Sequence, residues 1–223
     1  MDFKRPVAVL PNLAIHLNRA MNDGVALNAQ TDLLPICGMD EHMDTDTFLQ
    51  ILANETGEKP EDILCFDLSV YHYAEPVRTG FSGDMFMAPR IDNISSVQAC
   101  LTGLIEANPS DGISVAVLFD HEEIGSRSKN GANGNLLSYT LERICNALNI
   151  SRENFLQSLV HSYYLSLDVA HAIHPAHPEK SDITSAMPLN RGFAIKASAK
   201  HAYCSDDDMT GVILQLAARH HIA

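Results

Sequence analysis

The sequence predicts an α/β fold in which helices cover a mixed β-sheet, with a smaller β-rich part at the N-terminal side. The unbroken apolar run at residues 113–119 has the length and composition of a buried strand. Segments with helical periodicity lie on both sides of this run, at residues 94–107 and 135–148. Helices that alternate with buried strands in this way pack on the faces of a sheet.

The N-terminal part is predicted to contain one helix and one strand. Acids and threonines precede the apolar residues of the segment 44–55, which predicts a capped amphipathic helix that ends near Gly57. Residues 64–71 are rich in strand formers, which predicts one strand of a small sheet. Glycines and prolines make residues 76–89 a turn-rich connection. We therefore divide the chain into two parts, 1–84 and 85–223.

Four further elements are predicted in the C-terminal part. Ser151 is a suitable cap for a helix at residues 151–160, because its hydroxyl can accept a hydrogen bond from a backbone N–H of the first turn. Residues 163–169 and 192–197 are predicted strands. A last helix is expected at residues 209–220.

Composition excludes several classes of protein. The chain has 223 residues, of which 46% are hydrophobic, and this is enough to bury a substantial core. Lys and Arg number 15 against 28 Asp and Glu, so the formal net charge of −13 argues against nucleic acid or an anionic membrane as the main partner. The longest apolar runs are far shorter than the roughly 20 residues of a membrane helix.

The cysteines indicate a reducing compartment. Their number, five, is odd, and their spacing contains no CxxC pair. In a chain without a signal-like N-terminus, this pattern predicts reduced thiols and a cytoplasmic location. The five are Cys37, Cys65, Cys100, Cys145 and Cys204.

The strongest functional signal is the segment VAVLFDHEEIGS, residues 115–126, in which a predicted buried strand runs directly into acids. In open α/β sheets, ligands bind beyond the carboxyl ends of the strands. Of two adjacent glutamates on a turn, Glu122 and Glu123, one can bind a metal while the other deprotonates an attacking water. The alternative is a solvated acidic loop.

Two other acids lie in comparable positions. Asp92 begins a predicted helix, where it either caps the helix or binds a ligand. Asp168 ends a predicted strand and precedes two histidines. An aspartate and a glutamate at the ends of neighbouring strands can share one cation, and zinc accepts such oxygen ligands at about 2.0 to 2.2 Å. The three acids Asp92, Glu123 and Asp168 do not by themselves identify the metal.

Four segments resemble the aspartyl aminopeptidase family, in the order in which that family carries them. They are LAIHLNR at residues 13–19, RIDN at 90–93, DHEEIGS at 120–126 and DVAHAIHP at 168–175. The DHEEIGS element is shared with related two-zinc aminopeptidases, whereas LAIHLNR together with DVAHAIHP is much more specific. The resemblance spans nearly the whole chain.

The resemblance implies a catalytic centre with two zinc ions. Asp92 would bridge the ions, Glu123 would bind one and Asp168 the other, and Glu122 would be the general base. His16 would reach into the active site of a neighbouring subunit, so that the protein acts as a homo-oligomer. Without the resemblance, His16 is equally a hydrogen-bonded core or interface residue.

The resemblance also implies a substrate, a peptide with an acidic N-terminal residue. A buried carboxylate needs a cation or several donors as partners. Lys196 lies where the family carries a lysine implicated in acidic-substrate recognition, and Tyr203 lies near the companion aromatic position. Their alternatives are a surface lysine and a half-buried tyrosine. His171 is expected to line the pocket without binding metal directly.

In fold terms, the resemblance implies the zinc aminopeptidase type of α/β domain at residues 85–223, incomplete in this sequence. Residues 1–84 would belong to a β-rich domain for dimerisation and substrate gating. In the family, each zinc also has a histidine ligand, and neither histidine is found within these 223 residues. Because imidazole suits zinc better than additional carboxylates, we expect weak metal affinity and an inactive chain unless those ligands are supplied.

Two other functions fit the same residues. A related zinc aminopeptidase with a different side-chain preference would also carry DHEEIGS. A non-catalytic assembly subunit would keep the fold without the histidine ligands. Zinc content, together with an assay on aspartyl and leucyl arylamides, separates the three.

Overall fold

The computed structural model describes residues 1–40, 42–109, 111–182, 184–200, 203 and 205–222. The chain forms two compact units, Met1–Pro89 and Arg90–Ala223. The division falls at the C-terminal end of the turn-rich connection predicted at residues 76–89.

The N-terminal unit contains the predicted capped helix, which is confirmed as α1, Thr45–Thr56. The Asp44 carboxylate caps it by accepting hydrogen bonds from the backbone N–H and the hydroxyl of Thr47, at 2.8 and 2.7 Å. Gly57 ends it in the left-handed conformation, with φ of 76°, and donates its N–H to the Ala53 carbonyl. Both ends therefore follow from residues next to the helix.

The strand predicted at residues 64–71 is wrong, because the structure has no regular element there. Side chains hold this region instead. The Tyr71 hydroxyl donates to the Asp2 carboxylate at 2.6 Å, and the Tyr73 hydroxyl donates to the Lys4 carbonyl at 2.8 Å. Strand-forming composition supplies suitable side chains, but a strand also needs the backbone of a neighbour to pair with.

A hairpin occupies part of the connection predicted to be only turn-rich. Strands β1, Val77–Thr79, and β2, Met85–Met87, pair antiparallel, with Arg78 opposite Phe86. Gly80 begins the turn with φ of 88°, a conformation that favours glycine. One isolated antiparallel bridge joins Val9 to Ile36 elsewhere in this unit.

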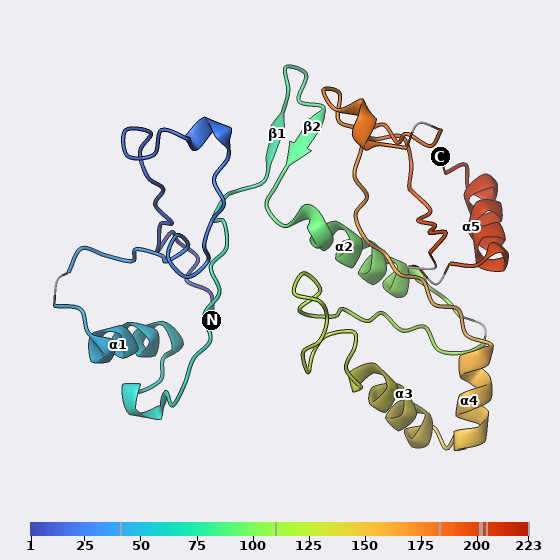
Figure 1. Ribbon diagram of the computed structural model, residues 1–223. Helices are drawn as coiled ribbons and strands as arrows, with labels where there is room; N and C mark the ends of the chain where they lie inside the picture. The colour runs from blue at the N-terminus through green and yellow to red at the C-terminus, as the bar shows by residue number, and fades with distance from the viewer. Residues whose placement is uncertain (41, 110, 183, 201–202, 204, 223) are drawn as a thin grey trace. The chain divides into compact units, whose positions relative to one another are not determined.

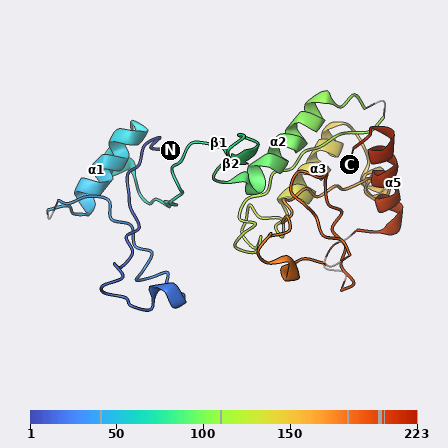
Figure 2. The ribbon, with the colours of Figure 1, turned by 90° about the horizontal axis from the view of Figure 1, so that it is seen from above.

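The helices predicted in the C-terminal unit are all confirmed. They are α2, Ile91–Glu106; α3, Leu136–Ala147; α4, Arg152–Val160; and α5, Asp207–Arg219 (Figure 1). The Ser151 hydroxyl caps α4 as predicted, accepting from the Asn154 N–H at 3.2 Å. In both views, α2 and α5 border a group of irregular segments (Figure 2). One-turn 3-10 helices lie at Met21–Asp23, Pro60–Asp62 and Pro178–Lys180.

The mixed sheet predicted for this unit is not formed by the described residues. The segments 113–119, 163–169 and 192–197 have no ladder hydrogen bonds, and β1 with β2 make up the one sheet in the described part of the chain. Apolar side chains predicted to be buried are accordingly exposed to solvent; Val115 is 47% and Leu165 60% exposed. The α/β class holds in a coarser form, as helices with a small antiparallel sheet.

The buried core is small in both units. Among the described residues, Leu52 and Ala53 of α1 are buried in the first unit, and Phe155 of α4 and Ala217 of α5 in the second. In the described ranges, none of the helices has the length and apolar character needed to cross a membrane.

Candidate metal and substrate site

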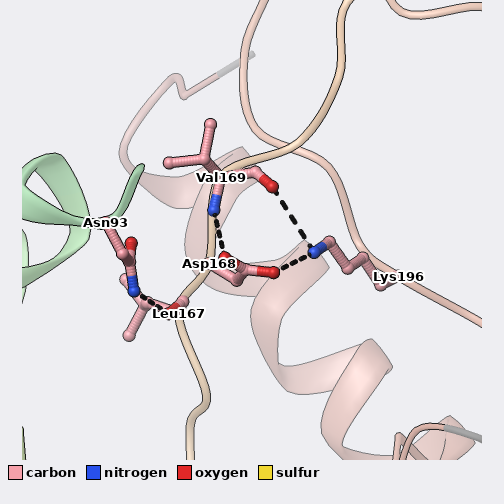
Figure 3. A network of polar contacts seen from close by, with 5 residues as sticks. All are labelled: Asn93, Leu167, Asp168, Val169 and Lys196. Carbon is pink, nitrogen blue, oxygen red and sulfur yellow. Dashed lines mark hydrogen bonds and ion pairs between the residues drawn. The ribbon is translucent and has the colours of Figure 1, made fainter. Parts of the chain in front are cut away.

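Asp168 is the best-connected acid of the predicted site. Its Oδ1 accepts the N–H of Val169 at 2.8 Å, and its Oδ2 lies 2.5 Å from Nζ of Lys196 (Figure 3). The hydrogen bond from Lys196 is the main cause that lowers the pKa of Asp168, and the Val169 N–H lowers it further. Both carboxylate oxygens therefore have donors.

Lys196 makes this contact from the segment predicted as a strand at residues 192–197. Its Nζ also lies 3.5 Å from the Val169 carbonyl oxygen, and its backbone carbonyl accepts a hydrogen bond from the Ser205 hydroxyl at 3.1 Å. The hydrogen bond to Asp168 raises the pKa of Lys196, and the charges of Asp168, Tyr203 and Asp92 raise it further. The side chains of Lys196 and Asp168 are 35% and 51% exposed, so solvent screens their attraction.

Asp92 lies in an irregular first turn of α2. Its φ and ψ of −84° and 107° are not helical, and the peptide bond to Asn93 is cis. The N-cap residue, Arg90, makes no side-chain capping hydrogen bond. The Asn93 amide donates to the Leu167 carbonyl at 3.3 Å, which joins this turn to the residue before Asp168 (Figure 3). The structure thus brings the segments of Asp92 and Asp168 together.

His171 and Tyr203, predicted to line the substrate pocket, belong to the same neighbourhood. The charge of His171 lowers the pKa of Asp168, after the larger effects of the hydrogen bond from Lys196, the Val169 N–H and the charge of Lys196, whereas burial raises it. The charge of Tyr203 raises the pKa of Lys196. The acidic residues that follow Tyr203 have a local role, because Asp206 caps α5 by accepting the Met209 N–H at 2.7 Å.

Glu122 and Glu123 lie in a tight turn, as predicted, and both are exposed. The turn closes through a hydrogen bond from the Gly125 N–H to the Glu122 carbonyl, at 2.9 Å. Gly125 has φ of 96°, which favours glycine at this point of the turn. The two glutamates are not gathered with Asp92 and Asp168 into one metal-binding group in the described structure.

Neighbouring side chains and a close backbone contact hold this acidic turn. His121 Nδ1 lies 2.6 Å from the Ser128 hydroxyl, and the Ser126 N–H donates to the His121 carbonyl at 2.9 Å. Gly131 packs directly on the backbone of Ser126. Residues 121–131 therefore form a compact loop that fixes the backbone positions of Glu122 and Glu123.

His16 belongs to the N-terminal unit, where it lies in an exposed turn. The turn is closed by hydrogen bonds from the N–H groups of Leu17 and Asn18 to the Ala14 carbonyl, at 2.8 and 3.1 Å. The apolar neighbours of His16 are also exposed, which disfavours the alternative of a core histidine in this structure.

The donor chemistry of the site fits a cation, although the set is incomplete. Asp92, Glu123 and Asp168 offer the carboxylate oxygens that zinc accepts. The ammonium group of Lys196 is itself a cation bound to Asp168, and the charge of Asp92 raises its pKa. Among the described residues, however, no group of three His, Cys, Asp or Glu side chains is close enough to hold a metal ion.

Sequence reasoning missed three groups that shape the site, namely Asn93, His121 and Ser128. Asn93 and His121 lie inside the RIDN and DHEEIGS segments, directly beside Asp92 and Glu122, so their position in a motif was the available signal. Nothing in the sequence marks Ser128, because its partner is identified only by the path of the loop.

Comparison of the fold with solved structures identifies the class of protein. A cryo-EM structure of the Ape4 and Nbr1 complex matches with a TM-score of 0.83 and 28% identity, over 98% of this chain and 46% of that chain. The crystal structure of prApe1 matches with a TM-score of 0.84 over 98% and 50% of the two chains, and at 24% identity it shows the fold alone. The fold is that of the Ape aminopeptidases.

The family follows from sequence comparison. Residues 1–223 match the family model described as aminopeptidase I zinc metalloprotease (M18). The probable M18 family aminopeptidase 2 of Clostridium novyi (strain NT) is 39% identical over 98% of this chain and 51% of its own length. Its counterpart in Clostridium acetobutylicum is 40% identical over 95% and 49%. This chain therefore belongs to the M18 family, and it spans about half the length of these relatives.

Proposed function

We propose that these residues form part of a metalloaminopeptidase that uses two zinc ions to release N-terminal aspartate or glutamate from peptides. Membership of the M18 family supports the aminopeptidase activity. The contact between Lys196 and Asp168 supports the acidic specificity, and it is the observation that carries the proposal. The scissile carbonyl and the side chain of an N-terminal residue are attached to the same α-carbon. The metal that binds the carbonyl and the cation that binds the side chain must therefore be no farther apart than one amino-acid residue can span.

Each acid has a distinct task in this proposal. Asp92, Glu123 and Asp168 hold the zinc ions, which when bound polarise the scissile carbonyl as Lewis acids. Glu122 takes a proton from the attacking water and passes it to the leaving amine. The turn that carries Glu122 leaves its carboxylate exposed to solvent, as a group that meets water and substrate requires.

The substrate pocket is assigned to Lys196, Tyr203 and His171. The ammonium group of Lys196 neutralises the carboxylate of the substrate side chain, since an anion that leaves water needs a partner. The charge of His171 lowers the pKa of Asp168 and that of Tyr203 raises the pKa of Lys196, which supports placing both beside this pair.

Self-association is the second part of the proposal. Residues 1–84 serve dimerisation and substrate gating, and His16 acts in the site of a neighbouring copy. The residues around His16 suit an interface, because Leu13, Ile15 and Leu17 are exposed in the same turn. We place the protein in the cytoplasm, with peptides and its own copies as partners and without nucleic acid or membrane.

One observation favours a second candidate, a non-catalytic assembly subunit. The described residues gather no group of three His, Cys, Asp or Glu side chains that could hold a metal ion. A zinc aminopeptidase with a different side-chain preference is a third candidate, in which Lys196 would not select the substrate.

Zinc content and substrate preference test these candidates. Residues 1–223 and the longest product of the reading frame that contains them are purified, their zinc is measured, and hydrolysis of aspartyl, glutamyl and leucyl arylamides is followed. We expect bound zinc and preference for the acidic substrates in the longer product. Zinc with leucyl preference supports the third candidate, and neither zinc nor turnover in either product supports the assembly subunit.

A further inference from the structure

The chain exposes far more surface than two compact units of its length require. Its accessible surface is 19368 Å². Separate compact units with the lengths of Met1–Pro89 and Arg90–Ala223 would together expose about 12,000 Å², by the usual scaling of area with mass. The excess, about 7,000 Å², is several times the area of about 800 Å² that each partner contributes to a standard interface. A partner that covers it has the size of a domain.

Within the C-terminal unit, the segment 113–119 has open backbone edges. Its sequence, ISVAVLF, contains no charged residue and no proline, the features that commonly protect an exposed strand edge. In the described chain, none of its N–H or C=O groups makes a backbone hydrogen bond. Such a row of unpaired groups is a template for an added β-strand.

Helix α3 faces this segment across an apolar cavity. The cavity has a volume of about 270 Å³, and its lining includes residues 115–119 and Leu136, Leu137 and Leu141 of α3. Leu118 is 51% exposed and Leu136 is 56% exposed. Side chains of an added strand alternate between its two faces, so an apolar residue of that strand can enter the cavity and remove these leucines from water.

The relatives indicate which polypeptide supplies the strand. The chain spans 51% and 49% of the two Clostridium aminopeptidases, so each of them contains a further stretch of about equal length. A stretch of that length matches the domain-sized excess of surface. A second copy of this chain is a poorer partner, because each copy has a net charge of −13 and the two repel each other.

We propose that residues 113–119 bind a β-strand from the polypeptide that makes up the other half of an M18-length protein. The added strand pairs with the open backbone edge and places an apolar side chain in the cavity against α3. Because Asp120 follows the segment directly, this pairing also orients the chain where it enters the turn of Glu122 and Glu123. The proposal concerns binding and does not depend on peptidase activity.

A mixing experiment tests the binding. Residues 1–223 are combined with the separately produced sequence of the Clostridium novyi relative that lies outside its match to this chain, and in parallel with that of the Clostridium acetobutylicum relative. We expect light scattering to show a complex with one copy of this chain, and fluorescence of the dye ANS, which reports exposed apolar surface, to fall. Amide exchange of residues 113–119 should slow by about tenfold or more.

Two substitutions locate the contact. Leu118→Lys places a charge at the cavity and should weaken the complex by about tenfold or more, because a buried ammonium group without a partner is costly. The half-exposed position of Leu118 lets the free chain keep its fold, which circular dichroism checks. The matched control is Leu64→Lys, since Leu64 is 92% exposed in the other unit and should tolerate the charge without effect on binding.

Three outcomes overturn the proposal. They are the absence of a complex with the polypeptide of either relative, equal affinity in the parent and Leu118→Lys, and an equal loss of affinity in Leu64→Lys. Self-association of residues 1–223 that Leu118→Lys abolishes would assign the surface to a second copy, and this result also overturns the proposed partner.

Discussion

Gly131 lies so close to Ser126 that an added Cβ atom at Gly131 would be 2.3 Å from the Ser126 carbonyl oxygen. The Cβ would also be 2.5 Å from the carbonyl carbon, and these are backbone atoms that cannot turn away. Close packing at this point allows the chain to return past the acidic turn that carries Glu122 and Glu123. Gly131 is therefore required for the shape of the loop, independently of any metal.

Replacement of Gly131 by alanine should open this loop. We expect Gly131→Ala to lower the free energy of unfolding by about 1–3 kcal/mol, because the backbone must shift to relieve the overlap. Denaturant unfolding measures the loss, and amide exchange of residues 121–131 locates it. The control is Gly211→Ala in α5, where an added Cβ meets no atom within 4 Å. Equal stability of Gly131→Ala and the parent would contradict the close contact.

The contact between His121 and Ser128 should matter for the position of Glu122. Ser128→Ala removes the hydroxyl that lies 2.6 Å from His121 Nδ1. We expect faster amide exchange at residues 121–126 and a loss of about 1 kcal/mol in unfolding free energy, as for a typical hydrogen bond. Ser128→Thr keeps the hydroxyl and should restore slow exchange. A loop that exchanges equally in all three proteins would show that the contact has no positional role.

Protonation of Asp44 should weaken α1. The hydrogen bond from the Thr47 N–H lowers the pKa of Asp44 below its ordinary value of 3.8. A lowered pKa in the folded chain means that the stabilisation is complete above the pKa of the unfolded chain and is lost as the pH falls through the lower, folded value. The protection of the Thr47 amide, measured as its exchange rate relative to the intrinsic rate at the same pH, should therefore fall in acid, below the range where an unfolded aspartate titrates.

Asp44→Asn should remove that pH dependence while keeping a cap, since asparagine also accepts the hydrogen bond. Asp44→Ala should show low protection of the Thr47 amide, relative to its intrinsic exchange rate, at every pH. Asp46→Ala serves as control, because Asp46 lies in the first turn of α1 without being its cap. Unchanged exchange in Asp44→Ala at neutral pH would show that the cap contributes nothing.

Glu122→Gln should abolish turnover of the longer product without removing its zinc. Glutamine keeps the shape of the side chain but cannot accept the proton, so kcat should fall by about 10²–10⁴-fold, the usual contribution of general base catalysis. Zinc content and kcat are measured on the same preparation, with Glu106→Gln at the end of α2 as control. Loss of zinc in Glu122→Gln would identify Glu122 as a metal ligand and exclude it as the base.

Mixing two inactive variants tests whether His16 acts between subunits. His16→Ala and Glu122→Gln should each be inactive. In a mixed pair, however, one site combines Glu122 of the His16→Ala copy with His16 of the Glu122→Gln copy, so both residues of that site are intact. For random pairing in a symmetric dimer, activity should recover to about a quarter of the parent value. Light scattering confirms that assembly occurs. Mixed assemblies without recovered activity would exclude His16 from the neighbouring site.

The helices show how far local sequence carries a prediction. Asp44 and Gly57 mark the ends of α1, and Ser151 marks the start of α4, because each acts on backbone groups only a few residues away. The same reasoning failed for residues 64–71 and 113–119, whose apolar and branched side chains are those of strands. Strand pairing depends on a partner distant in sequence, and composition does not name that partner.

The sequence by itself determined the helices, the family-specific segments and the identity of the acids Asp92, Glu122, Glu123 and Asp168. These features depend on neighbouring residues and on side-chain chemistry. Only the tertiary structure decided that Lys196 binds Asp168 and that Asn93 joins the segments of Asp92 and Asp168. Such contacts join residues far apart in the chain, so they depend on the whole fold bringing the segments within a few ångströms.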